Sequence, residues 1–186
     1  MALGHAFDRV LAAARADAGW AYERLYRDLS PSVCGYFRVQ GAQEPDDLTS
    51  EVFLGAFRGL AGFEGTEDQF RSWVFTIAHR RLTDERRRVS HRPPLADSWD
   101  DTYRDDPHGG DVEEDALRRM SAARVRALCE GLSHDQRDVL LLRLVSDMTV
   151  DAVAEALDKT PGAVKALQRR ALAALRQVLV REGVPL

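Results

Sequence analysis

The sequence predicts an all-α protein made of two small helical domains joined by a flexible acidic linker. Apolar residues recur at three- and four-residue spacing over most of the 186 residues, and the alternation of two that marks strands is absent. Periodicity is lost between residues 90 and 114, where prolines, glycines and acidic side chains gather. We therefore assign helical domains to residues 1–92 and 115–186 and the linker to residues 93–114. We expect the linker to hold the domains apart, without a shared apolar core.

The first domain is expected to contain several amphipathic helices. One or two should lie between Phe7 and Arg38, with Pro31 and Gly41 as breaks, and their apolar face should include Trp20. A further helix should begin near Pro45, with acidic residues in its first turn, and stop near Gly59 or Gly62. After a polar loop, residues 70–88 should form another helix with an apolar side and a basic side.

The second domain carries its own helix start signals. A helix is expected over about residues 115–129, and Ser133 with Gln136 has the spacing of a capping box ahead of the run VLLLRL. Thr149 should cap a short helix, and Thr160 followed by Pro161 should begin a long one that extends to about residue 177 and packs through Leu172 among others. Two helices separated by a tight turn, the second rich in basic residues, predict a helix-turn-helix that binds the DNA major groove.

The charge distribution and the cysteine content of the chain limit the functions that it can have. Residues 71–96 carry seven basic and two acidic side chains, whereas residues 97–115 carry one basic and nine acidic, so local charge favours DNA contact despite a net charge of −4. The two cysteines lie far apart, and no metal-ligand spacing, phosphate loop or paired nucleophile and base is present. We expect no cofactor, no metal, no enzymatic activity and, with no apolar run of membrane-spanning length, a cytoplasmic location.

Two blocks of sequence match a known family. Residues 46–58 (DDLTSEVFLGAFR), 63–65 (FEG) and 70–78 (FRSWVFTIA) resemble the second conserved region of extracytoplasmic-function (ECF) sigma factors of the sigma-70 family. Residues 132–143 (LSHDQRDVLLLR), 153–157 (VAEAL) and 162–171 (GAVKALQRRA) resemble the fourth region. The resemblance implies a promoter-specificity subunit of bacterial RNA polymerase, which binds the core enzyme and helps to open promoter DNA. It also implies polymerase clamp and flap as partners and allows an anti-sigma factor.

The resemblance implies three sets of site residues. Core-polymerase binding falls to one face of the helix after Pro45: Asp47, Ser50, Glu51, Leu54 and Arg58. Recognition of the −10 element falls to the polar loop and the basic helix after it: Thr66, Gln69, Thr76, His79, Arg80, Thr83 and Arg87. Recognition of the −35 element falls to the start of the last long helix: Thr160, Lys165, Gln168, Arg169 and Arg170.

Simpler interpretations stay open for several of these residues. The acidic face of the helix after Pro45 is also typical of an ordinary solvated surface. Phe63, Phe70 and Trp73 fit core packing better than base stacking. Arg137 and Arg143 fit either DNA-backbone or polymerase contacts. The main rival function is a stand-alone helix-turn-helix transcriptional regulator, which would bind duplex DNA specifically without polymerase, whereas a sigma factor needs the core enzyme.

Overall fold

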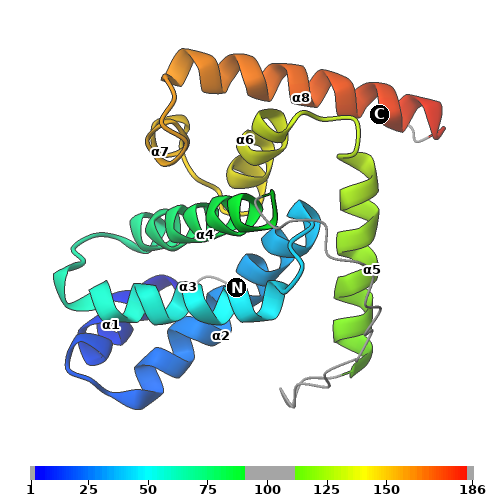
Figure 1. Cartoon of the computed structure of the whole chain (residues 1–186). Coiled ribbons are helices and arrows are strands. Elements are labelled where there is room, and N and C mark those ends of the chain that lie inside the picture. The colour runs from blue at the N-terminus through cyan, green and yellow to red at the C-terminus, as the bar shows by residue number, and fades with distance from the viewer. Residues whose placement is uncertain (1–2, 91–111, 184–186) are drawn as a thin grey trace.

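Helices α1 to α4 form the N-terminal half of the chain, as the computed structural model in Figure 1 shows. The structure describes residues 3–90 and 112–183. A short 3-10 turn, η1 (Gly4–Ala6), precedes α1 (Phe7–Arg15), α2 (Gly19–Gln40), α3 (Pro45–Gly59), the 3-10 turn η2 (Leu60–Gly62) and α4 (Glu67–Ser90). The expected order of helices is confirmed. Helix α4 begins three residues before the expected Phe70, because a cap at Thr66 adds its first turn.

Helix α2 runs through Pro31, so the expectation of a break there is wrong. A proline inside a helix removes one backbone hydrogen bond and costs about 3 kcal/mol. Pro31 itself is exposed, while Val33, Tyr36 and Phe37, which follow it on α2, have no exposed surface. The stabilisation from burying these side chains therefore outweighs the cost of a proline inside the helix. Gly41 does end the helix, in the left-handed conformation at φ 75°.

Aromatic side chains fill the centre of this half. Tyr36 contacts Phe75 with ring centroids 5.8 Å apart, and Phe70 contacts Phe7 at the same distance. Phe63 stacks on Trp73 at 5.1 Å. These contacts confirm that the aromatics around the polar loop pack together, and they fix the start of α4 against α1 and η2.

Helices α5 to α8 form the C-terminal half: α5 (Val112–Leu128), α6 (His134–Leu144), α7 (Val150–Ala156) and α8 (Pro161–Arg181). The three predicted caps are present. Ser133 and Gln136 form the reciprocal capping box of α6, and the side chains of Thr149 and Thr160 accept hydrogen bonds from the backbone N–H groups of Ala152 and Ala163. The structure describes no strand in residues 3–90 and 112–183, as expected.

Three residues of the predicted apolar patterns are exposed, among them Leu172, which we expect to pack in the core. The exposed fractions are 54% for Trp20, 64% for Leu144 and 45% for Leu172. Trp20 lies in the first turn of α2 and Leu144 in the last turn of α6, where no neighbouring helix covers them, and Leu172 lies beside the buried Ala171 on α8. Residue spacing alone does not show where a neighbouring helix ends.

The two halves pack against each other, so the expectation that they are held apart is wrong for this structure. Helix α5 packs along α2, and α7 packs on α4 (Figure 1). Buried side chains of both halves, among them Leu82, Leu142 and Met148, belong to one continuous apolar cluster. Most of the expected linker lies outside the described residues; its last three residues, 112–114, begin α5.

Candidate nucleic-acid interface

The outer face of α3 presents the residues predicted to bind polymerase. Asp47, Ser50, Leu54 and Arg58 are exposed, while Leu48, Val52 and Phe53 on the opposite face are buried. Leu54 leaves 56% of its surface in solvent, and half-buried Glu51 lies 3.8 Å from the Arg81 guanidinium of α4. The five residues therefore lie together on one exposed face, with an apolar side chain among charged ones.

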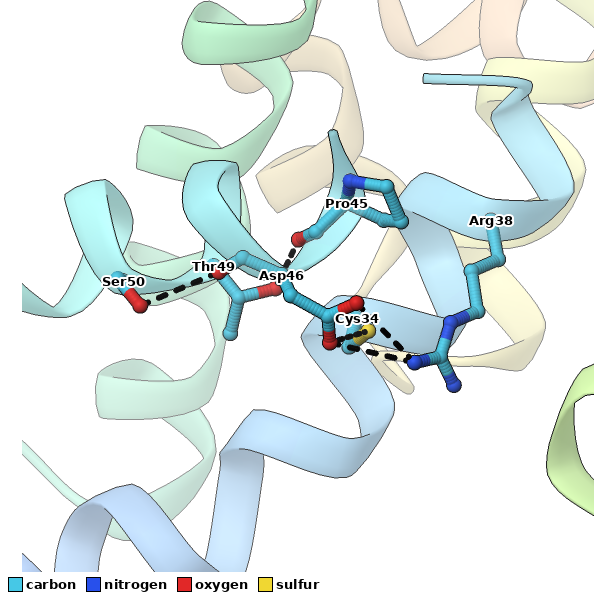
Figure 2. Close-up of polar contacts among 6 residues, drawn as sticks. All are labelled: Cys34, Arg38, Pro45, Asp46, Thr49 and Ser50. Carbon is cyan, nitrogen blue, oxygen red and sulfur yellow. Dashed lines mark hydrogen bonds and ion pairs between the residues drawn. The ribbon is translucent and has the colours of Figure 1, made fainter. Parts of the chain in front are cut away.

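A polar cluster fixes the start of α3 on α2 (Figure 2). Asp46 accepts a hydrogen bond from the Cys34 thiol at 3.2 Å and is paired with the Arg38 guanidinium at 3.2 Å. Burial raises the pKa of Cys34 to about 12, so the thiol stays protonated and donates to the carboxylate. The hydroxyls of Thr49 and Ser50 donate to the carbonyls of Pro45 and Asp46. This cluster orients the first turn of the exposed face.

Thr66 and Gln69, predicted in the −10 pocket, form a capping box at the start of α4. The Thr66 N–H donates to the Gln69 side-chain oxygen at 2.8 Å, and the Gln69 N–H donates to the Thr66 hydroxyl at 3.4 Å. Gly65 leaves room for this arrangement, since a Cβ there would lie 2.6 Å from that same Gln69 oxygen. The spacing Thr-x-x-Gln matches that of Ser133 and Gln136, so the sequence held a signal for this cap that the prediction missed. Both side chains are exposed.

The basic stripe on α4 is divided between solvent and protein. Arg80 and Arg87 are exposed. The hydroxyls of half-buried Thr76 and Thr83 donate to backbone carbonyls of the preceding turn. His79 is the exception, because its ring points into the protein and its Nδ1 lies 3.1 Å from the buried Tyr36 hydroxyl.

Burial lowers the pKa of His79 from its ordinary value of 6.5. Asp138 and Asp135 of the C-terminal half raise it, and Arg86 and Lys159 lower it, so four charged groups surround the ring besides Tyr36. Two of these four groups are acidic and two are basic, so their effects on the pKa oppose each other. Burial therefore determines the direction of the pKa shift. The imidazole is therefore neutral at pH 7 and lies where the two halves meet.

A polar cluster of buried Gln40 and Asp138 and half-buried Arg86 links the two halves beside His79. The Gln40 amide nitrogen, at the end of α2, donates to the Asp138 carboxylate of α6 at 2.5 Å. Arg86 of α4 donates to the Gln40 amide oxygen at 2.9 Å, and its guanidinium lies 3.5 Å from the same carboxylate. Sequence reasoning missed these residues, since Gln40 is separated from its partners by 46 and 98 positions.

The helix-turn-helix is formed by α7 and α8. Asp158 adopts a left-handed conformation at φ 52° in the turn between them, and the N–H of Lys159 donates to the Ala154 carbonyl. Lys165, Arg169 and Arg170 are exposed on α8 and Gln168 is half-buried, so these side chains share an accessible stretch of helix. Thr160 is exposed, and its hydroxyl caps α8.

Two arginines of α6 have structural roles. The Arg137 guanidinium donates to the Cys129 carbonyl at the end of α5, at 3.0 Å, and the Arg143 guanidinium donates to the Met148 carbonyl. Both are half-buried. These bonds position the turn before α6 and the loop after it, which neither of the two sequence interpretations anticipated.

Neither a metal site nor a membrane span is found in the part of the chain that the structure describes. That part holds no group of three or more His, Cys, Asp or Glu side chains arranged to bind a metal ion. None of its helices combines the length and apolar character needed to cross a bilayer.

Comparison with known proteins identifies both halves. The family model "Sigma-70 region 2" matches residues 22–92, and "Sigma-70, region 4" matches residues 130–177. The chain is 31% identical over 132 residues to the ECF RNA polymerase sigma factor ShbA of Streptomyces griseus, covering 70% of this chain and 69% of ShbA. It is 31% identical to the ECF RNA polymerase sigma factor BldN of Streptomyces coelicolor, covering 89% of this chain and 63% of BldN.

A third relative and a solved structure extend the match. The ECF RNA polymerase sigma factor SigD of Mycobacterium tuberculosis is 28% identical, with 97% of this chain and 87% of SigD covered. CnrH, solved in complex with the cytosolic domain of CnrY, shares the fold at a TM-score of 0.64 and 22% identity, covering 92% of this chain and 96% of CnrH. By these matches the chain belongs to the ECF sigma factors of the sigma-70 family, the sigma subunits of bacterial RNA polymerase.

Proposed function

We propose that this chain directs RNA polymerase to its promoters through a division of labour between its halves. The exposed face of α3 binds the core enzyme, the loop before α4 and the basic stripe on α4 contact the −10 element, and α8 contacts the −35 element. Residues 1–92 and 115–186 are the two functional units. The protein itself carries out no catalysis; its role is to bind and position, in the cytoplasm where transcription takes place.

The observation that carries this proposal is the set of basic side chains on α8. Lys165, Arg169 and Arg170 are exposed within the first three turns of the second helix of a helix-turn-helix. In such motifs the N-terminal residues of the second helix reach base edges in the major groove, and arginine is the commonest partner of guanine. The exposed Leu54 on α3 supplies a separate surface for a protein partner.

Transcription with purified core polymerase on a randomised promoter library tests the proposal. We expect transcripts only when this chain is added, from promoters that share two elements. Arg169→Ala should weaken selection of the upstream element by about 1–3 kcal/mol while core-enzyme association is retained. Arg176→Ala is the matched control, since Arg176 is also exposed on α8 but lies two turns further along.

Two results would contradict the proposal. If no promoter in the library is transcribed and the free chain binds duplex DNA tightly and specifically, the stand-alone regulator is favoured. Equal loss of upstream selection and core association in Arg169→Ala would contradict the division of labour.

We also propose that a separate protein sequesters this chain. CnrH is known in complex with the cytosolic domain of CnrY, and the likeness in fold makes a partner of that kind reasonable here. Co-purification of the intact chain from its own cells, followed by identification of what is bound, tests this point. Recovery of core polymerase alone would contradict it.

A further inference from the structure

The turn that precedes α1 binds a carboxylate of α4. Leu3 lies in the right-handed helical region at φ −66°, and Gly4 lies in the left-handed region at φ 53°. This pair of conformations points two successive backbone N–H groups in one direction and forms an anion-binding nest. The Leu3 N–H donates to one oxygen of the Glu67 carboxylate at 2.6 Å, and the Gly4 N–H donates to the other at 2.9 Å. We call Leu3, Gly4 and Glu67 the N-terminal contact.

The N-terminal contact is partly shielded from solvent. Leu3 is 9% exposed and belongs to the same apolar cluster as Phe70, and the Glu67 side chain keeps 19% of its surface in solvent. Arg71, one turn further along α4, places its guanidinium 4.0 Å from the Glu67 carboxylate. Hydrogen bonds from N–H groups to a carboxylate are stronger than those between neutral groups. The N-terminal contact therefore holds α4 more firmly than an ordinary pair of hydrogen bonds would.

Glu67 lies beside the residues proposed to contact the −10 element. Thr66 and Gln69, which form the capping box of α4, are exposed, whereas Glu67 between them is half-buried and its carboxylate binds the turn before α1. Glu64 and Gly65 of the preceding loop are also exposed, so packing contributes little to their position. The position of this loop therefore depends on how the first turn of α4 is held.

Two contacts hold that turn on its inner side. Phe70 packs on Phe7 of α1 with ring centroids 5.8 Å apart, and Glu67 binds the turn before α1. Residues three apart lie on one face of a helix, so both contacts attach the same face of α4 to the same N-terminal segment. The apolar contact is non-directional, whereas two hydrogen bonds to one carboxylate define an orientation. The N-terminal contact is thus the directional one of the two.

We propose that Glu67 is a positioning residue of the −10 site: through the N-terminal contact it fixes the orientation in which Thr66 and Gln69 are presented to the bases of the −10 element. This inference rests on the function proposed above for the loop before α4. A base that leaves the duplex stack loses stacking energy, and groups that are already in place recover more of it than groups that must first be ordered. Loss of the N-terminal contact therefore weakens capture of −10 bases and leaves the surfaces on α3 and α8 unchanged.

The variant Glu67→Gln tests the carboxylate. It replaces one accepting oxygen by an NH₂ group, which then faces a backbone N–H donor. Asp68→Asn is the matched control, since Asp68 is exposed in the same first turn of α4. Both variants remove one negative charge near the positive end of the helix dipole and near the proposed DNA surface. A difference between them therefore reports the N-terminal contact alone.

The variant Gly4→Pro tests the nest from its other side. Proline has no N–H to donate and cannot adopt φ 53°, and no side chain or backbone atom lies within 4 Å of a Cβ at this position. Gly19→Pro is its matched control. Gly19 is the first residue of α2, where proline is tolerated, and Ala18 before it is already extended.

Hydrogen exchange of the backbone amides in residues 63–70 of the intact, free chain is the first measurement. In Glu67→Gln and in Gly4→Pro we expect exchange there to be faster by on the order of tenfold, because the turn opens more often. The two controls should exchange at the wild-type rate. This measurement requires neither DNA nor polymerase. Far-UV circular dichroism of each variant reports whether helix content is retained.

The second measurement is the affinity of the complex with core polymerase for a single-stranded oligonucleotide that carries the −10 element selected from the promoter library. Glu67→Gln and Gly4→Pro should each lower this affinity by on the order of tenfold. The double variant should show no further loss, because both changes remove the same contact. Core association and selection of the −35 element should stay at wild-type values, whereas a general loss of structure would lower all three.

Each result bears on the proposal. Unchanged exchange in residues 63–70 overturns it, and so does unchanged affinity for the oligonucleotide, an equal loss in Asp68→Asn, or an additive loss in the double variant. If Glu67→Gln loses helix content, Gly4→Pro decides by the same criteria. Failure of the wild-type chain to co-migrate with core polymerase would contradict the proposed function and leave the exchange measurement intact.

Discussion

At the scale of single residues, His79 shows how packing changes what a side chain can do. In the sequence it belongs to a basic stripe, yet its Nδ1 lies 3.1 Å from the buried Tyr36 hydroxyl and the C-terminal half lies over it. Burial lowers its pKa, so it does not share the positive charge of Arg80 and Arg87. In this structure it is a neutral contact between the halves.

The lowered pKa of His79 predicts a loss of stability in acid. Above the ordinary pKa of 6.5 the ring is neutral in both folded and unfolded chains. As pH falls below that value the unfolded chain takes up the proton first, so the free energy of unfolding decreases until pH passes the lowered folded-state pKa. Urea unfolding over a pH series should show a shallower decrease in His79→Gln than in the wild type. The same decrease in both would contradict the assignment.

Leu54 is an exposed leucine among charged residues on α3, and it predicts an apolar contact with core polymerase. Leu54→Glu should reduce core-enzyme association about tenfold or more, because a carboxylate would be buried there without a partner. Met120→Glu is the matched control, since Met120 is 69% exposed on α5, away from this face. Association measured by gel filtration or fluorescence should be unchanged in the control. Equal effects in both variants would contradict a specific contact.

At the scale of elements, the starts of α4, α6, α7 and α8 are set by local hydrogen-bond patterns. The caps at Ser133, Thr149 and Thr160 satisfy backbone N–H groups that have no partner inside the helix, and Thr66 with Gln69 does the same for α4. The cap at Thr66 also shapes the loop proposed to contact the −10 element. Stability and the proposed DNA contact therefore involve the same residue.

Substitutions at Thr66 can separate its two roles. Thr66→Ala should lower the free energy of unfolding by about 1 kcal/mol, because one cap hydrogen bond is lost, whereas Thr66→Asp should keep most of it. If the residue also lies near DNA phosphates, Thr66→Asp should still weaken binding of −10 DNA by the polymerase complex, because the carboxylate is repelled. Urea unfolding and DNA binding measured on both variants check this. Normal DNA binding by Thr66→Asp would limit Thr66 to a structural role.

At the scale of the whole molecule, one apolar cluster joins both halves. Leu142 and Val153 of the C-terminal half belong to the same cluster as Phe75 and Leu82 of the N-terminal half. Proteins with a continuous core unfold cooperatively, whereas separate domains unfold independently. The contacts among Gln40, Arg86 and Asp138 and the shared apolar contacts therefore make the stability of each half depend on the other.

Leu142→Ala tests this dependence. Leu142 is fully buried in α6, and its truncation should cost about 2–5 kcal/mol. Trp20 and Trp73 both lie in the N-terminal half, so tryptophan fluorescence in a Trp99→Phe background reports unfolding of that half. We expect the fluorescence midpoint in urea to fall together with the midpoint seen by circular dichroism. A fluorescence midpoint that stays at the wild-type value would show that the halves unfold independently.

The sequence by itself determined where most helices lie, how α6, α7 and α8 start, and which face of α3 and α8 stays exposed. Those features depend on hydrogen bonds that close within three or four residues and on apolar spacing along one helix. The tertiary structure alone decided that α2 continues through Pro31, that Trp20 and Leu172 are exposed, that the His79 ring points into the protein and that the halves are packed together. Contacts such as that of Gln40 with Asp138 join residues 98 positions apart, and no local pattern encodes which helices meet.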